Sequence, residues 1–423
     1  MKKVLIVTYY WPPAGGPGVQ RWLKFVTYLP QFGVTPVLYI PENPHYPLTD
    51  ESLLQEVPSG IKIYKNPISE PYRFAKLLFG NKTSRISAGI IPKKNSSLAE
   101  NILLYIRGNY FIPDARINWV KPSVKAITQI LQKETIDTII TTGPPHSMHL
   151  IGYELQQRTG IKWIADFRDP WTSIGYHKEL RLGKRAQNKH KRLEQRVLTA
   201  ADTIIVTSHT TKKEFQELTK KPITVITNGY DDDYKGDATL DADFTMSHIG
   251  SLLSERNPEV LWKTLAELIK EQPTFKEHFK LQLIGVVSQE ITASLQEYGL
   301  TDYVTLYGYL THAEAVQYQR RSQVLVLLEI NSVETKGIIP GKLFEYMAAR
   351  RPIIGIGPKD WEVNAIVRKT ETGVVFNYDD HSKLKSELLR IFKEYREGKV
   401  TLKTQDITAY SRKELTRELA KHL

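Results

Sequence analysis

Short runs rich in β-branched residues alternate with helical stretches along the whole chain, and this alternation constrains the fold more than any other feature. In the first half the runs lie at residues 3–8, 35–40, 138–142, 163–166, 203–207 and 223–227. In the second half they lie at residues 244–249, 280–284, 304–307, 324–328, 352–356 and 373–376. Parallel sheets with helices on both faces show this pattern. The sequence therefore predicts an α/β fold.

The length of 423 residues is too great for one small domain and predicts two or three domains. An acidic, turn-rich stretch at 228–243 separates the two sets of strands and predicts an interdomain linker. We expect a first domain at 1–228, with a proline-rich insertion over one sheet edge at about 43–120, and a second domain at 244–405. Three leucines with helical spacing near the end of the chain predict an amphipathic C-terminal helix.

The composition excludes several classes of site. The chain has no cysteine, which excludes disulfides, thiol nucleophiles and Cys-ligated metal centres and is typical of a reducing compartment. We expect a cytoplasmic protein. The apolar run at residues 4–7 is too short for a signal peptide, and no segment approaches the 18 or so apolar residues of a spanning helix, so neither is expected.

Positive charge is concentrated in the first half. Residues 1–200 hold 28 Lys and Arg against 14 Asp and Glu, net +14, whereas residues 201–423 hold 30 against 32, net −2. This asymmetry indicates an anionic partner for the first half, such as a phosphate-bearing substrate or an acidic membrane surface, or else only a solvated basic surface. No zinc-finger or RNA-recognition signature is present, so no nucleic acid partner is expected.

A glycine-rich turn follows the first predicted strand. It contains Gly15, Gly16 and Gly18 and should open a helix, where free backbone N–H groups favour an anion. A dinucleotide fingerprint would need a third glycine at Arg21, so a Rossmann cofactor is not expected. A turn without a ligand is the alternative interpretation.

The second half contains a comparable candidate for binding phosphate. Lys342 and Glu345 lie one helical turn apart, directly after Gly341. The ammonium group could meet a phosphate while the carboxylate accepts hydrogen bonds from a ribose diol. The alternative is that Lys342 and Glu345 form a surface ion pair, which would contribute about 0.3 kcal/mol to the stability of the helix.

Together these motifs resemble the family 4 glycosyltransferases of the GT-B fold over nearly the whole chain. The resemblance implies two Rossmann-like domains facing a central cleft, with residues 406–423 crossing back to the first domain. The family's Gly-Arg-Leu motif reads Gly250-Ser251-Leu252 here, and its lysine is replaced by Arg256. The family's Glu-x7-Glu pattern ends at Glu345, but its first glutamate is replaced by Gly337.

The resemblance also implies roles for individual residues. The predicted catalytic residues are Arg256, Lys342, His146 and Asp169. The predicted donor-binding residues are Gly15, Gly16, Gly250, Ser251, Gly285, Tyr309, Leu310, Gly337, Ile338, Ile339 and Glu345. The predicted acceptor-binding residues are Arg21 and Arg168.

Structural roles remain open for several of these side chains. His146 could be a loop histidine that caps a helix, and His149 is expected to contribute to packing. Arg168 and Asp169 could form an ion-paired turn with Asp166.

Three consecutive aspartates, at 231–233, have the carboxylate density of the metal sites of GT-A transferases. Their place in the linker favours a solvated hinge instead, and no metal site is expected.

The resemblance implies a retaining transferase that moves a sugar from a nucleoside-diphosphate sugar to a glycan or lipid-linked acceptor in cell-surface polysaccharide or glycoconjugate biosynthesis. No catalytic metal or cofactor is implied. The basic first half fits peripheral contact with an anionic inner-membrane surface. Two alternatives remain: a nucleotide-sugar epimerase of the same fold and a non-catalytic protein that binds sugar nucleotides.

Overall fold

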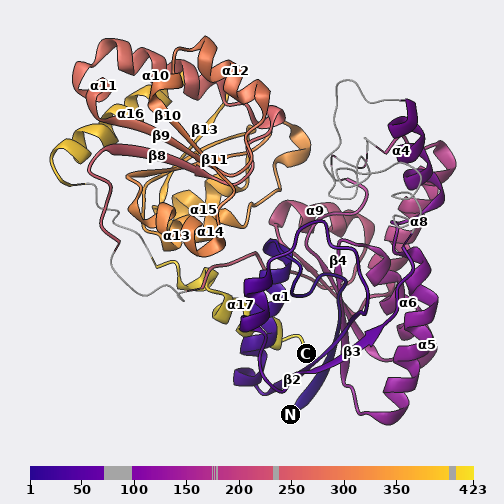
Figure 1. The fold of residues 1–423 in the computed structure, drawn as a ribbon. Coiled ribbons are helices and arrows are strands. Elements are labelled where there is room, and N and C mark those ends of the chain that lie inside the picture. The colour runs from indigo at the N-terminus through magenta and orange to yellow at the C-terminus, as the bar shows by residue number, and fades with distance from the viewer. Residues whose placement is uncertain (71–97, 174, 176, 178–179, 232–237, 400–405) are drawn as a thin grey trace. The chain divides into compact units, whose positions relative to one another are not determined.

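The computed structural model describes residues 1–70, 98–173, 175, 177, 180–231, 238–399 and 406–423 (Figure 1). The chain forms two compact units. The first contains Met1–Thr227 together with Arg412–Leu423, and the second contains Asn228–Ser411. Each unit is built on a parallel β-sheet with helices on both faces, which confirms the predicted α/β class.

The first unit contains a sheet of seven parallel strands in the order β3-β2-β1-β4-β5-β6-β7. Runs of Val, Ile, Leu and Thr form the central strands because both faces are covered. The strands are β1 (Lys2–Val7), β2 (Val34–Pro41), β3 (Lys62–Asn66), β4 (Thr138–Gly143), β5 (Lys162–Phe167), β6 (Thr203–Val206) and β7 (Ile223–Val225).

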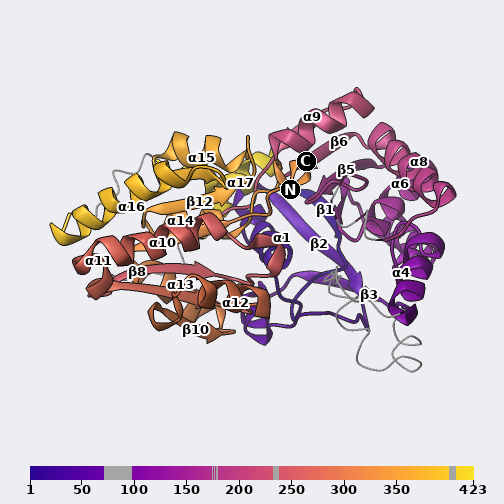
Figure 2. The ribbon, with the colours of Figure 1, turned by 90° about the horizontal axis from the view of Figure 1, so that it is seen from above.

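Helices cover both faces of this sheet (Figure 2), and the side chains of β1 alternate between them. Leu5 and Val7 pack into a core with α5, α6, α8 and α9, whereas Val4 and Ile6 pack into a core with α1 and α17. The helices are α1 (Pro17–Tyr28), α4 (Leu98–Tyr110), α5 (Ile117–Lys133), α6 (Ser147–Thr159), α8 (Lys184–Ala200), α9 (His209–Leu218) and α17 (Arg412–Ala420).

The second unit has six parallel strands in the order β10-β9-β8-β11-β12-β13. The strands are β8 (Phe244–Ile249), β9 (Phe279–Ile284), β10 (Val304–Gly308), β11 (Val324–Leu328), β12 (Ile353–Gly357) and β13 (Gly373–Asn377). Helices α10, α11, α12 and α16 pack on one face, and α14 and α15 pack on the other. The helices are α10 (Glu259–Glu271), α11 (Pro273–His278), α12 (Gln289–Glu297), α13 (His312–Arg321), α14 (Lys342–Ala348), α15 (Val363–Thr370) and α16 (His381–Arg396).

The strand order reverses once in each sheet. In the first sheet the chain runs outward from β1 to β3 and then returns to place β4 on the other side of β1; in the second sheet β8 and β11 have the same relation. Open α/β sheets bind ligands outside the carboxyl ends of the strands at such a switch point. A ligand site is therefore expected at the loops after β1 and β4 in the first unit and after β8 and β11 in the second.

The structure differs from the sequence-based expectation at β3. This strand lies within the stretch predicted to be an irregular insertion, but it pairs with β2 as an edge strand of the main sheet. Its sequence, Lys-Ile-Tyr-Lys-Asn, has no apolar run because an edge strand has one neighbour and is only partly covered. A hydrophobic pattern search misses such strands for this reason.

None of the helices in the described ranges has both the length and the apolar character that crossing a bilayer requires.

The C-terminal helix α17 contributes apolar side chains to the core of the first unit. Leu415 and Leu419 are buried beside Trp22 and Val26 of α1. Burial on one face of a helix is the main source of its stability in a protein. The last twelve residues are thus a structural part of this unit.

Replacing Leu419 by Ala should lower the free energy of unfolding by about 2–5 kcal/mol, because it leaves a cavity in this core. Urea denaturation followed by circular dichroism measures the change. The matched control is Lys413→Ala, at an exposed position of the same helix, which should change stability by less than about 0.5 kcal/mol. Equal stability of both variants would show that α17 does not stabilise the unit.

Candidate functional site

Glycines allow two loops to pack closely at the carboxyl edge of the second sheet. Gly250 follows β8 with a φ of +118°, and Gly285 follows β9 with a φ of +122°, in a region that favours glycine. A methyl group at Gly285 would lie 2.7 Å from the carbonyl carbon and oxygen of Gly250. The backbone at this edge is therefore free of side chains where the loops meet.

The side chain of Lys342 lies over this glycine pair. A methyl group at Gly250 would lie 2.5 Å from Nζ of Lys342, so the ammonium group rests directly on the backbone of the loop after β8. Lys342 is the first residue of α14, as predicted. Helix α14 has only seven residues, so its dipole does not by itself indicate anion binding. The ammonium group of Lys342 is what indicates it.

Lys342 is partly buried, and its charge state responds to its surroundings. Burial, the largest cause, and the nearby Arg256 guanidinium lower the pKa of Lys342 to about 8. The carboxylates of Glu329 and Glu345 act in the opposite direction. The ammonium form therefore predominates at neutral pH and is lost as the pH rises through about 8.

Arg256 lies in a short 3₁₀ turn, Ser254–Arg256, on the loop after β8. Its Nε and Nη2 atoms each lie 3.2 Å from Oε1 of Glu329, at the carboxyl end of β11. About a third of the Arg256 side chain is exposed, whereas Glu329 is 1% exposed. The ion pair thus holds the guanidinium at the switch point while part of it still faces solvent.

Glu329 was missed by the sequence analysis. Its Oε1 also accepts a hydrogen bond from the backbone N–H of Ile330, at 2.9 Å. Its other oxygen, Oε2, is buried and accepts no hydrogen bond from any residue that the structure describes. The sequence feature that could have identified Glu329 is its position directly after the wholly apolar strand Val324–Leu328. A carboxylate at the end of a buried strand indicates a specific role, because carboxylates are rarely buried unless they are paired.

Glu345 lies on α14 one turn after Lys342, and two side chains of α13 contact its carboxylate. Oε2 accepts a hydrogen bond from Nε2 of Gln319 at 2.9 Å, and Oε1 lies 3.4 Å from Nε2 of His312. The side chain is 22% exposed. These contacts fix its position and leave part of its surface open to a ligand.

The turn before α14 contains Gly337, Ile338 and Ile339. The Ile338 N–H donates to the Thr335 carbonyl at 3.0 Å, and the Ile338 carbonyl accepts from Nε1 of Trp361 at 2.7 Å. Neither Gly337 nor Ile339 donates to a main-chain oxygen of the described residues. Two amides of a fixed turn are thereby left for other acceptors.

The remaining predicted donor residues lie on the loops around this edge. Ser251 is exposed beside Gly250. Tyr309, after β10, is 66% exposed, and Leu310 packs partly against the core next to α14. No described contact joins Tyr309 to Lys342 or Arg256, so its place near the site rests on the shared sheet edge alone.

In the first unit, the loops after β1, β4 and β5 meet at the corresponding edge. A methyl group at Gly18 would lie 1.5 Å from Nη1 of Arg168, so the guanidinium lies against the start of α1. Arg168 also donates a hydrogen bond to the carbonyl of Pro144. Gly16, with a φ of +109°, caps α1 beside this contact, and Gly15 donates to the Leu48 carbonyl at 3.0 Å.

His146 is enclosed in this edge, directly before α6. Its ring stacks on Trp171, with 5.0 Å between ring centroids, and is 4% exposed. Neither ring nitrogen has a hydrogen-bond partner among the described residues. Burial, with a smaller contribution from His149, lowers the pKa of His146 well below its usual value, so the imidazole is neutral.

His149 packs as expected. It stacks on Phe167 with 4.1 Å between ring centroids, and its Nδ1 lies 2.9 Å from Oγ1 of Thr141.

The two aspartates after β5 differ in their surroundings. Asp166 accepts hydrogen bonds from Nε1 of Trp22 at 2.9 Å and Oγ1 of Thr142 at 2.8 Å. Asp169 accepts no hydrogen bond from any of the described residues. Burial raises the pKa of its carboxyl group. Asp166 is therefore structural, and Asp169 is the carboxyl group left for a ligand.

Arg21 is part of the same structural network. It pairs with Asp166 at 3.2 Å and donates to the carbonyls of Ile226 and Thr227. Its side chain is 2% exposed. An acceptor could not reach the Arg21 guanidinium in this arrangement, because the group is enclosed and already bonded to the protein.

Of the linker aspartates, Asp231 is described and the next two lie outside the described residues. Across the described ranges, no three His, Asp or Glu side chains are grouped as metal ligands would be.

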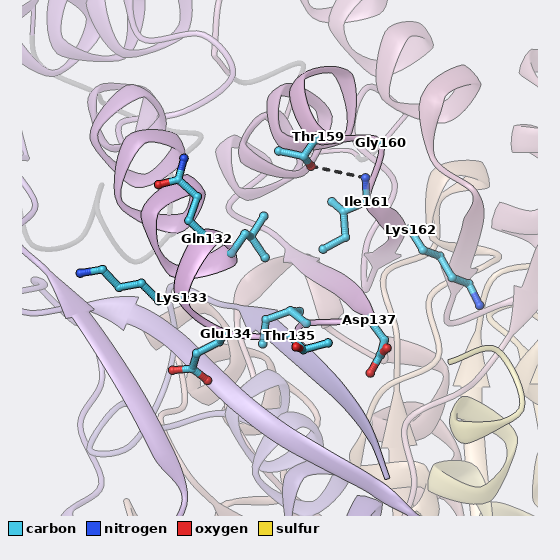
Figure 3. A pocket seen from close by; sticks show the side chains of 11 residues that line it. Gln132, Lys133, Glu134, Thr135, Asp137, Thr159, Gly160, Ile161 and Lys162 are labelled. Atoms are coloured by element: carbon cyan, nitrogen blue, oxygen red, sulfur yellow. Dashed lines mark hydrogen bonds between the residues drawn. The ribbon is translucent and has the colours of Figure 1, made fainter.

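A hollow of ≈ 660 Å³ lies at the other end of the first sheet (Figure 3). It is lined by residues 131–137, which lead into β4, and by residues 159–162, which lead into β5. These are the amino ends of the strands, opposite to His146 and Arg168. The hollow therefore plays no part in the candidate site.

The Glu329→Gln variant should lower the pKa of Lys342 further below about 8, because it removes a negative charge that raises it. An NMR titration of the lysine side chains measures the shift, with the Lys342 signal assigned by its loss in Lys342→Arg. Glu297→Gln, an equal change of charge at an exposed position of α12, should leave this pKa unchanged. An unaltered titration in Glu329→Gln would show that the carboxylate does not act on Lys342.

Two family models match the chain over complementary ranges. The model described as Glycosyltransferase Family 4 matches residues 90–234, and the model described as Glycosyl transferases group 1 matches residues 243–394. Together they span most of both units. Among curated proteins, the sequence comparison finds no match.

Several solved structures match this chain along its whole length. TarM of S. aureus, in complex with fondaparinux, alpha-GlcNAc-glycerol and UDP, is 10% identical with a TM-score of 0.60, covering 100% of this chain and 99% of that chain. Sucrose-phosphate synthase from Thermosynechococcus elongatus is 15% identical with a TM-score of 0.57, covering 100% and 95%. A protein from Listeria monocytogenes, provisionally identified as a UDP-N-acetylglucosamine 2-epimerase, is 11% identical with a TM-score of 0.56, covering 99% and 95%.

At these identities the structural likenesses establish the fold, and the two sequence models establish the family. The resemblance predicted from the sequence is confirmed: the chain belongs to the family 4 glycosyltransferases and has the GT-B fold.

Proposed function

We propose that this glycosyltransferase moves a sugar from a nucleoside-diphosphate sugar to a glycan or lipid-linked acceptor, with retention at the anomeric carbon. The observation that carries the proposal is the pair of cations, Arg256 and Lys342, at the switch point of the second sheet. The expected pathway is the synthesis of a cell-surface polysaccharide or glycoconjugate.

The donor would bind in the second unit through its diphosphate. The exposed part of Arg256 and the ammonium group of Lys342 offer two positive charges to the phosphoryl oxygens. Glu345, already oriented by Gln319, would accept hydrogen bonds from the ribose hydroxyls. A divalent metal would not be needed to balance the charge of the diphosphate.

The sugar would meet the turn before α14. The family's first glutamate is replaced by Gly337, so a carboxylate is not supplied there. The N–H groups of Gly337 and Ile339, which donate to no main-chain oxygen of the described residues, could contact a sugar hydroxyl instead.

The reaction would break the bond between the anomeric carbon and the phosphate oxygen, and the electron pair would leave with the nucleoside diphosphate. The acceptor oxygen would form the new bond on the same face, and its proton would pass to the departing phosphate. Arg256 and Lys342 would stabilise the charge that develops on the leaving group. No side-chain nucleophile takes part in this scheme.

The acceptor would bind in the first unit. Arg168 lies at the edge next to the glycine loop and could hold an acceptor phosphate, and Asp169 could orient an acceptor hydroxyl. The ring of His146 is 4% exposed and its two nitrogens have no partner among the described residues, so it could contact a sugar hydroxyl only if the loops around it open. TarM, whose structure contains UDP and alpha-GlcNAc-glycerol, provides a precedent for the two substrate classes.

An epimerase is the second candidate, because one of the similar structures is provisionally identified as one. An epimerase would need a carboxylate or histidine to move a proton at the sugar. Release of an epimerised sugar without an acceptor would favour this candidate. Nucleotide binding without any consumption of the donor would favour a non-catalytic role.

We expect the protein to act in the cytoplasm, at an anionic membrane surface.

Replacing Arg256 or Lys342 by Ala should lower turnover ten-fold or more if each side chain supplies about 1.4 kcal/mol at the transition state. The donor is first identified by a thermal-shift screen of UDP, GDP, ADP, TDP and their sugars, since a ligand of the native state raises the midpoint. The matched control is Lys336→Ala, which removes a lysine of the preceding turn that pairs with Asp360 at 3.2 Å. Normal turnover of both site variants would exclude the proposed roles.

The affinity for the nucleoside diphosphate should fall as the pH rises above about 8, by up to about ten-fold per pH unit. The reason is that the free protein loses the Lys342 proton near this pH, and the anion binds the protonated form better. Titration calorimetry from about pH 7 to about pH 10 measures the trend. Lys342→Arg keeps its proton throughout and should bind with little dependence on pH; the same dependence in both proteins would contradict the assignment.

A further inference from the structure

Helix α8 of the first unit carries positive charge that the candidate site does not use. Seven cationic side chains are exposed along it and its approach, and we call them the α8 basic face: Arg181, Lys184, Arg185, Lys189, Lys191, Arg192 and Arg196. The only acidic residue between positions 181 and 200 is Glu194, which is buried and accepts hydrogen bonds from Thr172. The face therefore holds one sign of charge.

This arrangement does not stabilise the helix that carries it. Arg185 and Lys189, and likewise Arg192 and Arg196, are like charges four residues apart on one helix, which repel each other. Lys184 and Arg185 lie in the first turn, where the helix dipole disfavours cations, and no acidic residue is present there. A charge pattern that opposes helix stability points to an anionic partner outside the chain.

The cations stay open to such a partner. Within the described parts of the chain, none of the first six members of the α8 basic face forms an ion pair. Arg196 lies over the ring of Tyr153 and donates to its hydroxyl. The opposite side of α8 is anchored in the core by Val197 and Leu198. The charges thus lie on a rigid element.

Apolar side chains are exposed directly beside this face. Helix α4 packs against the start of α8, where Oδ1 of Asn109 accepts a hydrogen bond from the Gly183 N–H at 2.8 Å (Figures 1 and 2). Tyr105, Ile106 and Tyr110 of α4 are 49%, 39% and 72% exposed. A surface that combines clustered cations with exposed tyrosines and an isoleucine is typical of contact with a bilayer interface.

We propose that the α8 basic face and the exposed residues of α4 dock the protein on a bilayer that contains anionic phospholipid. The inference rests on the proposed function, because a lipid-linked acceptor would bring the first unit to a membrane. Lipid headgroups would neutralise the cations, and the three apolar side chains would enter the interfacial region. A nucleic acid would satisfy the cations but would leave Ile106 in water.

The test measures binding of the full chain to vesicles by flotation. Vesicles of phosphatidylcholine alone should not retain the protein, whereas vesicles that also contain phosphatidylglycerol should. Binding should weaken as salt is added, because salt screens the charges.

The triple variant R185Q/K189Q/R192Q should lower the partition coefficient on anionic vesicles by about five-fold per charge, on the order of 100-fold in total. The matched control K270Q/K276Q/K280Q removes the same net charge from exposed positions of the second unit and should bind as the unchanged protein does. The variant Y110S should retain the salt-sensitive binding but lose the part that persists at high salt.

Two outcomes would overturn the proposal: equal loss of binding in the triple variant and its control, and a chain that binds an oligonucleotide but not anionic vesicles. The thermal shift produced by UDP separates this proposal from the proposed function. The triple variant should keep the shift of the unchanged protein, since no residue of the donor site is altered. Vesicle binding without any nucleotide-induced shift would support the docking surface and count against the transferase.

Discussion

Two cations at one sheet edge repel each other, and the buried carboxylate of Glu329 makes their closeness possible. Arg256 is held to it at 3.2 Å, and Lys342 is stabilised in its ammonium form by the same charge. A carboxylate without both positive neighbours would be costly to bury. The three side chains therefore form one electrostatic unit, and the proposed binding of a diphosphate depends on its balance.

Close backbone packing places these charges where the strands end. Gly250 and Gly285 bring the loops after β8 and β9 into contact, and Lys342 lies on Gly250 where any side chain would collide with it. The first unit uses the same device, since Gly18 leaves room for the guanidinium of Arg168. In both units a missing side chain at the switch point lets a long cation lie against the main chain, where it can meet a ligand.

Positive charge in the first unit has two distinct physical uses. Arg21 is enclosed with Asp166 and two carbonyl groups, and its charge contributes to the packing of the loops behind the site. The α8 basic face is exposed, unpaired with the described acids and unfavourable for its own helix, which is why we propose an anionic partner for it. A net charge of +14 for residues 1–200 does not separate these uses, because it counts both alike.

The sequence by itself determined the α/β class, the strands of both sheets other than β3 and the first turn of α14, because these depend on local apolar runs and on glycines next to strand ends. Only the tertiary structure decided the edge pairing of β3, the enclosure of Arg21 and the meeting of Arg256 with Glu329, which lie 73 residues apart. Contacts between distant residues depend on the order of strands in the sheet. Local patterns of residues carry no record of that order.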